Sequence, residues 1–206
     1  MRRIVKQHAP TFFSDWLRGS SPDWTPSWGA LDSDPVTKQR LKEHLVDEQR
    51  RLCCYCESRV EATETSSHIE HLDSRSEHGE LDVTYDNLLA SCMRQGSCGD
   101  AKGAQTLPLT PLDEGCERAF RYFGDGTVAV FGGFGRTDDA AEALRVLKLD
   151  HPELVHRRRE VLRTIDRLDG ADLQLEIDHA THGAPEFVTA IRQHLHAGTG
   201  RGRLYA

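Results

Sequence analysis

Hydrophobic residues recur at helical spacing in several polar stretches of this chain. In residues 36–51, Leu41, Leu45 and Val46 form one apolar stripe while lysines and glutamates cover the other faces, which predicts an amphipathic helix. A shorter helix is expected over residues 11–17. Three more helices are predicted. A Thr-Asp-Asp cap begins the first, over residues 137–148, and a proline in the first turn begins the second, over residues 152–168. An amphipathic pattern predicts the third, over residues 185–196.

Short runs of alternating or β-prone residues predict strands between these helices. Residues 59–62 and 68–72 are two such runs. Residues 119–123 and 127–131 flank a Gly-Asp-Gly turn, which is the signal of a hairpin. The apolar run that follows Asn87 instead predicts a helix, with that residue or the aspartate before it as the N-cap.

The predicted helices and strands place the chain in the α+β class, and its composition suits a modest core. The chain has 206 residues, of which 37% are hydrophobic and 29% charged, enough for one domain or for a small core with additions. We expect an N-terminal arm and helix in residues 1–50, a central core in 51–106, and a β-hairpin with a mostly helical region in 107–206. The chain has no apolar run near the roughly 20 residues of a membrane span and no signal-peptide pattern, which predicts a cytoplasmic protein with reduced thiols.

All three tryptophans lie near the N-terminus, at Trp16, Trp24 and Trp28. The segment after residue 17 has little predicted regular structure. The tryptophans are interpreted as a satellite core, and an exposed docking surface is the alternative.

Four cysteines have the spacing of a metal site. Cys53 and Cys56 form a C-x-x-C pair, whose tight turn can aim two thiolates at one zinc ion about 2.3 Å away. Cys92 and Cys98 are expected to supply the second pair, with a spacer longer than the usual two residues. The alternatives are unrelated buried thiols or two disulfides, but a reducing compartment and the lack of a βαβ redox context favour zinc. The two remaining cysteines are interpreted as small buried hydrophobic side chains.

A carboxylate beside an imidazole is what metal-assisted phosphodiester hydrolysis requires. Glu70 is suited to hold a hard divalent cation, Mg²⁺ or Mn²⁺, and His71 to take a proton from the attacking water. Such pairs also occur by chance, and Asp178-His179 is interpreted as one of them, on the surface. The flanking cysteines and Asn87 favour a functional role for the first pair, in which Asn87 fixes the loop behind His71.

Basic side chains are candidates for contacts with nucleic acid. Arg75 lies in the hydrophilic loop over residues 73–81, Arg94 lies between the second pair of cysteines, and residues 157–159 are three arginines. The loop and the arginine run have the alternative interpretation of solvated surface charge. The formal net charge is −7, whereas a lone nonspecific nucleic-acid binder is usually basic. We therefore expect either a local contact or a partner that delivers the nucleic acid.

Together, the cysteine pairs, the Glu-His pair and the Asn-Leu after it resemble the signature of the HNH, or ββα-metal, nucleases. The resemblance implies a zinc-stabilised ββα core in which Glu70 binds the catalytic cation, His71 is the general base and Asn87 orients it. It also implies four structural zinc ligands: Cys53, Cys56, Cys92 and Cys98.

The family usually has His or Asn directly after the last cysteine, where this chain has Gly99. Asp100 is the nearest replacement as second ligand of the catalytic cation, and His78 is a weaker candidate. Lys102 matches a lysine that is common after the motif, and it is interpreted as a phosphate contact.

The surrounding residues narrow the resemblance. The start of the chain, residues 48–57, the Ile-Glu-His strand and the ending Cys98-Gly99-x-x-Lys102 are similar to PtuB, the HNH subunit of Septu and retron-linked anti-phage systems. The likeness is strong over residues 48–102 and is only a similarity of pattern beyond 110. It implies an endonuclease for DNA or RNA that works in an antiviral defence complex with a PtuA-like ATPase.

Two other classes of protein fit parts of the pattern. A non-catalytic zinc module that docks to a partner protein or nucleic acid would explain Gly99 in the signature, but it would not need the Glu70-His71 pair. An enzyme with catalytic zinc is disfavoured because four cysteine ligands leave no open position on the metal.

Overall fold

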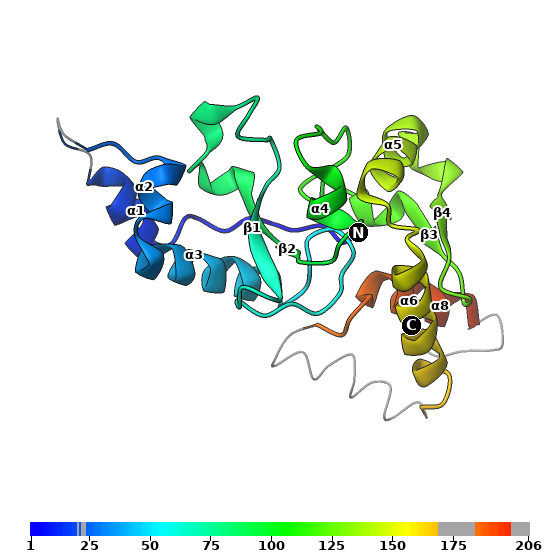
Figure 1. Cartoon of the computed structure of the whole chain (residues 1–206). Coiled ribbons are helices and arrows are strands. Elements are labelled where there is room, and N and C mark those ends of the chain that lie inside the picture. Colours follow the sequence, from blue (N-terminus) through cyan, green and yellow to red (C-terminus); the bar gives the residue numbers. More distant parts are fainter. Residues whose placement is uncertain (20, 22–23, 169–183, 199–206) are drawn as a thin grey trace.

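The computed structural model of the chain describes residues 1–19, 21, 24–168 and 184–198. Within these residues, helices combine with two small antiparallel sheets, so the expected α+β class is confirmed. Figure 1 shows the N-terminal helices at one end of the molecule, the first sheet in the middle, and the second sheet with the later helices at the other end. In these ranges no helix is both long enough and apolar enough to cross a membrane.

Three helices form the N-terminal end: α1 (Thr11–Arg18), α2 (Trp28–Asp32) and α3 (Pro35–Glu48). α1 and α3 match the two helices expected here, and the apolar stripe of α3 is buried as predicted. α2 lies in a segment for which no regular structure was predicted. It begins because the Ser27 side chain accepts a hydrogen bond from the Ala30 N–H at 3.2 Å.

The central sheet pairs β1 (Ser67–His71) with β2 (Leu88–Cys92) in antiparallel register. The helix predicted after Asn87 is wrong, because a short 3₁₀ turn (Tyr85–Asn87) leads directly into β2. Every residue of β2 is buried, so the run has no periodicity that separates a strand from a helix. The strand predicted over residues 59–62 is reduced to one bridge between Leu52 and Arg59.

A short helix, α4 (Cys98–Lys102), follows β2 and completes a β–β–α unit with the hairpin. The outer edge of β2 is closed by the fully buried amide of Gln49. Its Oε1 accepts from the Ala90 N–H at 2.7 Å, and its Nε2 donates to the Ala90 and Leu52 carbonyls at 2.8 and 2.9 Å. This side chain satisfies the main-chain groups of β2 that a third strand would otherwise pair with.

The remaining described chain contains the predicted hairpin and three helices. The elements are β3 (Phe120–Tyr122), β4 (Val128–Val130), α5 (Thr137–Leu147), α6 (Pro152–Ile165) and α8 (Val188–Gly198). Short 3₁₀ turns lie at Gly79–Leu81, Cys116–Arg118 and Gly132–Phe134. The pair Asp178-His179 lies outside the described residues.

Candidate functional site

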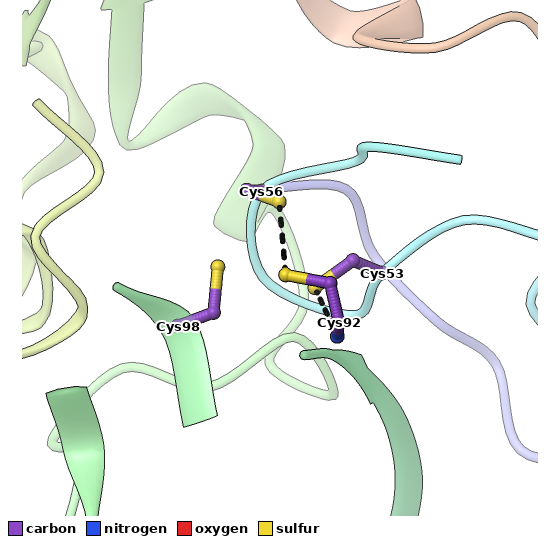
Figure 2. A group of neighbouring side chains, drawn as sticks. All are labelled: Cys53, Cys56, Cys92 and Cys98. Atoms are coloured by element: carbon purple, nitrogen blue, oxygen red, sulfur yellow. Dashed lines mark hydrogen bonds between the residues drawn. The ribbon is translucent and has the colours of Figure 1, made fainter. Parts of the chain in front are cut away.

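The four predicted cysteines converge on one point, although they come from three parts of the chain (Figure 2). Their sulfur atoms all lie within 4.8 Å of one another, and all four side chains are buried. Among the described residues, this is the one group of at least three His, Cys, Asp or Glu side chains whose ligand atoms lie so near one another. Four buried sulfur atoms at this spacing are a possible site for a metal ion such as zinc.

Local backbone contacts build this cluster. Residues 53–58 form a tight turn in which the Glu57 N–H donates to the Cys53 carbonyl at 3.1 Å and the Cys53 N–H donates to the Ser58 carbonyl at 2.9 Å. Two main-chain N–H groups point at sulfur, from Ser58 to Cys56 Sγ and from Cys92 to Cys53 Sγ, each at 3.4 Å. Such donors stabilise thiolates, which are the form that binds a metal.

The electrostatics of the cluster also favour a cation. Neighbouring thiols and burial raise the pKa of Cys98 well above its ordinary value, because several negative sulfur atoms cannot share a dry site. A divalent cation removes that penalty, since it offsets the charge of the thiolates. The two cysteines outside the cluster are buried, as predicted: burial raises the pKa of Cys54 well above its ordinary value and that of Cys116 to about 12.

Glu70 lies near the end of β1 with only 6% of its surface exposed. One carboxylate oxygen, Oε1, accepts a hydrogen bond from Tyr55 Oη at 3.0 Å and forms an ion pair with Lys102 Nζ at 3.3 Å. The other, Oε2, lies 2.8 Å from Nε2 of His68. Burial and the adjacent carboxylate raise the pKa of Tyr55 well above its ordinary value, so the phenol stays protonated and donates.

Lys102 is buried beneath this carboxylate. Its side chain is 1% exposed, and Nζ also donates to the His71 carbonyl at 2.9 Å. This position differs from the phosphate contact inferred from the sequence, because the ammonium group faces the protein interior. Lys102 instead holds Glu70 and the end of β1 in place.

The His71 ring has a defined tautomer. Nε2 lies 2.8 Å from the Asp82 carbonyl, which can only accept, so Nε2 carries the hydrogen and Nδ1 keeps a free electron pair. The Trp28 ring packs edge-on against the imidazole, with 4.5 Å between ring centroids. Burial lowers the pKa of His71, and the nearby Arg75 lowers it further, so the ring is neutral at neutral pH.

Asn87 fixes the loop that carries the Asp82 carbonyl. Its Oδ1 accepts from the Asp73 N–H at 2.8 Å, and its Nδ2 donates to the Asp73 and Leu81 carbonyls at 3.0 and 3.2 Å. The side chain is 5% exposed. No contact between Asn87 and the His71 ring is among these bonds, so Asn87 acts on the ring through the loop between Asp73 and Asp82.

Two other candidates for metal binding, Asp100 and His78, have partners other than Glu70. The Asp100 carboxylate is exposed and accepts a hydrogen bond from the Gly96 N–H at 2.6 Å. His78 lies in the loop with Nδ1 3.3 Å from the Glu80 carboxylate. The structure therefore brings neither side chain into a group with Glu70 among the described residues.

The basic candidates also have partners within the protein. Arg75 is exposed, and its guanidinium lies 4.8 Å from the centre of the Trp28 ring. Arg94 forms an ion pair with Glu153 of α6, so α6 holds it. The arginines at 157–159 contact a glutamate side chain and two main-chain carbonyls of the same chain. Of these side chains, Arg75 is the one that remains exposed beside His71.

Sequence reasoning missed three residues of this site: Tyr55, His68 and Trp28. Tyr55 stands inside the C-x-x-C turn, and His68 is two residues before Glu70, a spacing that places both on one face of a strand. The spacing of two residues therefore predicts that His68 lies beside Glu70. Trp28 reaches His71 only through the unpredicted helix α2, and no local pattern indicates this contact.

Compared with known proteins, the chain matches no family model and no curated protein. The site itself provides two centres on one β–β–α unit. One is a closed set of four sulfur atoms. The other consists of the buried carboxylate of Glu70 and, one residue further along β1, the neutral imidazole of His71, which can accept a proton.

Proposed function

We propose that this protein is a metal-dependent HNH-type endonuclease that hydrolyses phosphodiester bonds of DNA or RNA. One observation carries the proposal. His71 is adjacent to the buried Glu70, and its Nε2 is fixed on the Asp82 carbonyl at 2.8 Å, which leaves Nδ1 as a base of defined direction. A neutral imidazole of fixed orientation, one residue after a held carboxylate on the same strand, supplies the base that metal-assisted hydrolysis needs.

Glu70 is the residue that fits a catalytic Mg²⁺ or Mn²⁺ ion. Its Oε1 is held by Tyr55 and Lys102, while Oε2 has no main-chain partner and faces the half-exposed His68. Carboxylate oxygens are the ligands that these hard cations prefer. A bound cation would neutralise charge on the phosphate and on the leaving oxygen.

His71 would act at Nδ1. In hydrolysis, the oxygen of a water molecule forms a bond to phosphorus, the ester P–O bond breaks, and Nδ1 takes the proton of the water. The Asp82 carbonyl would stabilise the resulting imidazolium through Nε2–H, much as an orienting acceptor does in other acid–base sites. Trp28 packs on the ring and keeps it from rotating away.

The four cysteines would bind zinc with a structural role. They leave no open coordination position, and they join the turn at residue 53, the end of β2 and the start of α4. In this proposal zinc fixes the hairpin that presents Glu70 and His71 and takes no part in the reaction.

The proposal includes a partner. The formal charge of −7 is unfavourable for holding a nucleic acid alone, and two of the basic candidates, Arg94 and Arg157, form ion pairs within the chain. We propose that a PtuA-like ATPase presents the substrate and that the pair acts in antiviral defence. The resemblance of residues 48–102 to PtuB supports this step.

The test is cleavage by the wild-type protein and by His71→Ala, on plasmid, single-stranded DNA and tRNA, with Mg²⁺ or Mn²⁺, each with and without the ATPase. We expect His71→Ala to lower the cleavage rate about 10²–10⁴-fold without loss of zinc or of the fold. His194→Ala, in α8, is the control for an unrelated histidine. Wild-type rates in His71→Ala would contradict the assignment.

One observation favours a second candidate, a non-catalytic docking module. Lys102 already pairs with Glu70 at 3.3 Å, and such an ion pair can serve only to stabilise the hairpin. In that case no substrate is cleaved under any condition, yet the zinc-loaded protein still binds the ATPase. The same assay series therefore separates the two functions.

A further inference from the structure

His68 and Glu70 approach each other on one face of β1. They are two residues apart on the strand, so their side chains leave on the same side, and His68 Nε2 lies 2.8 Å from Glu70 Oε2. Across the sheet, His68 is opposite Ser91, whose Oγ accepts from the Gly99 N–H at 3.2 Å. The first turn of α4 is thereby held directly against this pair.

Gly99 leaves the space that the pair occupies. A Cβ atom at this position would lie 2.5 Å from Glu70 Oε2 and 2.7 Å from His68 Nε2, closer than real Cβ contacts allow. Its backbone does not require glycine, since no positive φ is present there. The absence of a side chain at position 99 is therefore explained by the imidazole and carboxylate that fill the space above it.

We propose that His68 is the second protein ligand of the catalytic divalent cation, together with Glu70, and that its imidazole replaces a ligand from helix α4. The inference rests on the proposed function and specifies the ligand set of the same site. Two ligand atoms bound at right angles to one cation, at 2.0–2.2 Å, lie about 3 Å apart. The observed separation of 2.8 Å between Nε2 and Oε2 matches this value.

A histidine ligand also changes which cation the site prefers. Imidazole is a ligand for transition metals, whereas Mg²⁺ favours oxygen donors. The site should therefore bind Mn²⁺ in preference to Mg²⁺, and His68→Asp should reduce that preference. At 35% exposure, the His68 side chain is open enough for a cation to reach the pair from solvent.

The first experiment titrates Mn²⁺ into zinc-loaded protein and records the nitrogen coupling of the bound ion by pulsed electron paramagnetic resonance. We expect a histidine nitrogen signal in the wild type, its loss in His68→Ala, and affinity at least about tenfold lower in that variant. His194→Ala is the matched control, because His194 also pairs with a carboxylate, that of Asp166 at 2.7 Å. An unchanged nitrogen signal in His68→Ala would overturn the proposal.

His68→Gln separates a ligand from a residue that only positions Glu70. Glutamine keeps a hydrogen-bond donor near Oε2 but supplies no imidazole nitrogen. Loss of the nitrogen signal together with weak Mn²⁺ binding is expected. Wild-type affinity in His68→Gln would mean that His68 merely orients the carboxylate, and the proposal would fail.

A ligand exchange gives the positive test. The double variant His68→Ala with Gly99→His moves the imidazole from β1 to α4; the clash with the ring at 68 is removed, and Oε2 of Glu70 has to move away from the new Cβ. It should regain the nitrogen signal and most of the Mn²⁺ affinity lost in His68→Ala. Failure to regain either, in protein that keeps its zinc and its circular dichroism, would show that the two positions do not share one site.

The outcomes separate this inference from the proposed nuclease activity. If the wild type binds Mn²⁺ through His68 but cleaves no substrate, the ligand assignment stands and the function fails. If the wild type cleaves and His68→Ala binds Mn²⁺ with unchanged affinity, the function stands and the ligand assignment fails.

Discussion

The four-cysteine cluster and the Glu70–His71 site share one hairpin, along which His71 is the residue farthest from the cluster, and they are built differently. Ser67 pairs with Cys92 at the cluster end, while His71 pairs with Leu88 at the other. The cluster consists of identical side chains that are buried and that, with a bound metal ion, would form a closed coordination shell. The second site combines side chains of different types, and a different partner fixes the orientation of each one.

This difference explains why one centre suits stability and the other chemistry. A closed set of sulfur ligands gains its free energy on folding and has no position left for a substrate. At Glu70, by contrast, Tyr55 and Lys102 hold one carboxylate oxygen and leave the other toward a half-exposed histidine. Both centres share β1, β2 and α4. A substitution that destroys the cysteine cluster should therefore also disrupt the Glu70–His71 site, whereas a substitution at Glu70 or His71 should leave the cluster intact.

Loss of one cysteine ligand should have the largest effect. Cys98→Ser removes one of the four proposed zinc ligands, and we expect a loss of more than about 4 kcal/mol in the free energy of unfolding, with loss of bound zinc. Cleavage should fall with the folded fraction. Urea unfolding and metal analysis measure both quantities.

Cys54→Ala is the matched control for that prediction. Cys54 is also buried but lies outside the cluster, so its truncation should cost about 1 kcal/mol and leave the zinc content unchanged. Equal effects of Cys98→Ser and Cys54→Ala would mean that the cluster holds no metal.

Asn87→Ala should damage the second site and leave zinc in place. The substitution removes three hydrogen bonds to Asp73 and Leu81 in a buried position, for a stability loss on the order of 3 kcal/mol. Because the loop carries the acceptor for His71, the cleavage rate per folded molecule should fall as well. The rate is measured at a temperature where both proteins are folded.

Gln49→Ala is the control, because Gln49 also makes three buried hydrogen bonds through its amide, at the edge of β2. It should lower stability by a similar amount but not the rate per folded molecule. If the two variants lower that rate equally, Asn87 has no special effect on His71.

The sequence predicts those parts of the two centres that depend on local spacing. The C-x-x-C turn and the adjacent Glu-His pair are of this kind, and the four cysteines meet as expected. The carboxylate–imidazole site depends on longer contacts. Trp28 meets His71 through helix α2, which has only five residues and a serine cap. Nothing in the local pattern predicts such packing.

Two errors have the same physical origin. The run after Asn87 is buried on both faces, so its composition did not separate a strand from a helix. The resemblance assigns Lys102 to a phosphate because it matches a lysine that is common after the motif, whereas in the structure it is 1% exposed and paired with Glu70. In both cases tertiary packing overrides the local preference. Gly99, which the sequence could only mark as a departure, is explained once β1 lies against α4.

Tyr55→Phe should have a smaller effect that is confined to the carboxylate. It removes the hydrogen bond to Oε1, which is worth about 1.5–3 kcal/mol for a charged acceptor, and leaves Lys102 in place. Because a held carboxylate binds a cation better, Mn²⁺ affinity should fall about tenfold. Isothermal titration calorimetry on zinc-loaded protein measures it. Tyr85→Phe is the matched control, since Tyr85 donates to Glu48 at 3.0 Å, and it should leave Mn²⁺ affinity unchanged.

Arg75→Ala should have the smallest effect and leave both centres intact. The side chain is exposed and covers Trp28, which packs on His71, so it is the described basic candidate best placed to meet a phosphate near the proposed base. Loss of one phosphate contact should reduce the slope of a plot of the logarithm of the binding constant for nucleic acid against the logarithm of salt concentration by about 1, with zinc content unchanged.

Arg75→Lys should keep the slope, because it keeps the charge. Arg145→Ala, on α5, removes an exposed arginine elsewhere and should change nothing. An unchanged slope in Arg75→Ala would mean that Arg75 only shields Trp28, and that the contacts that hold the substrate come from the partner.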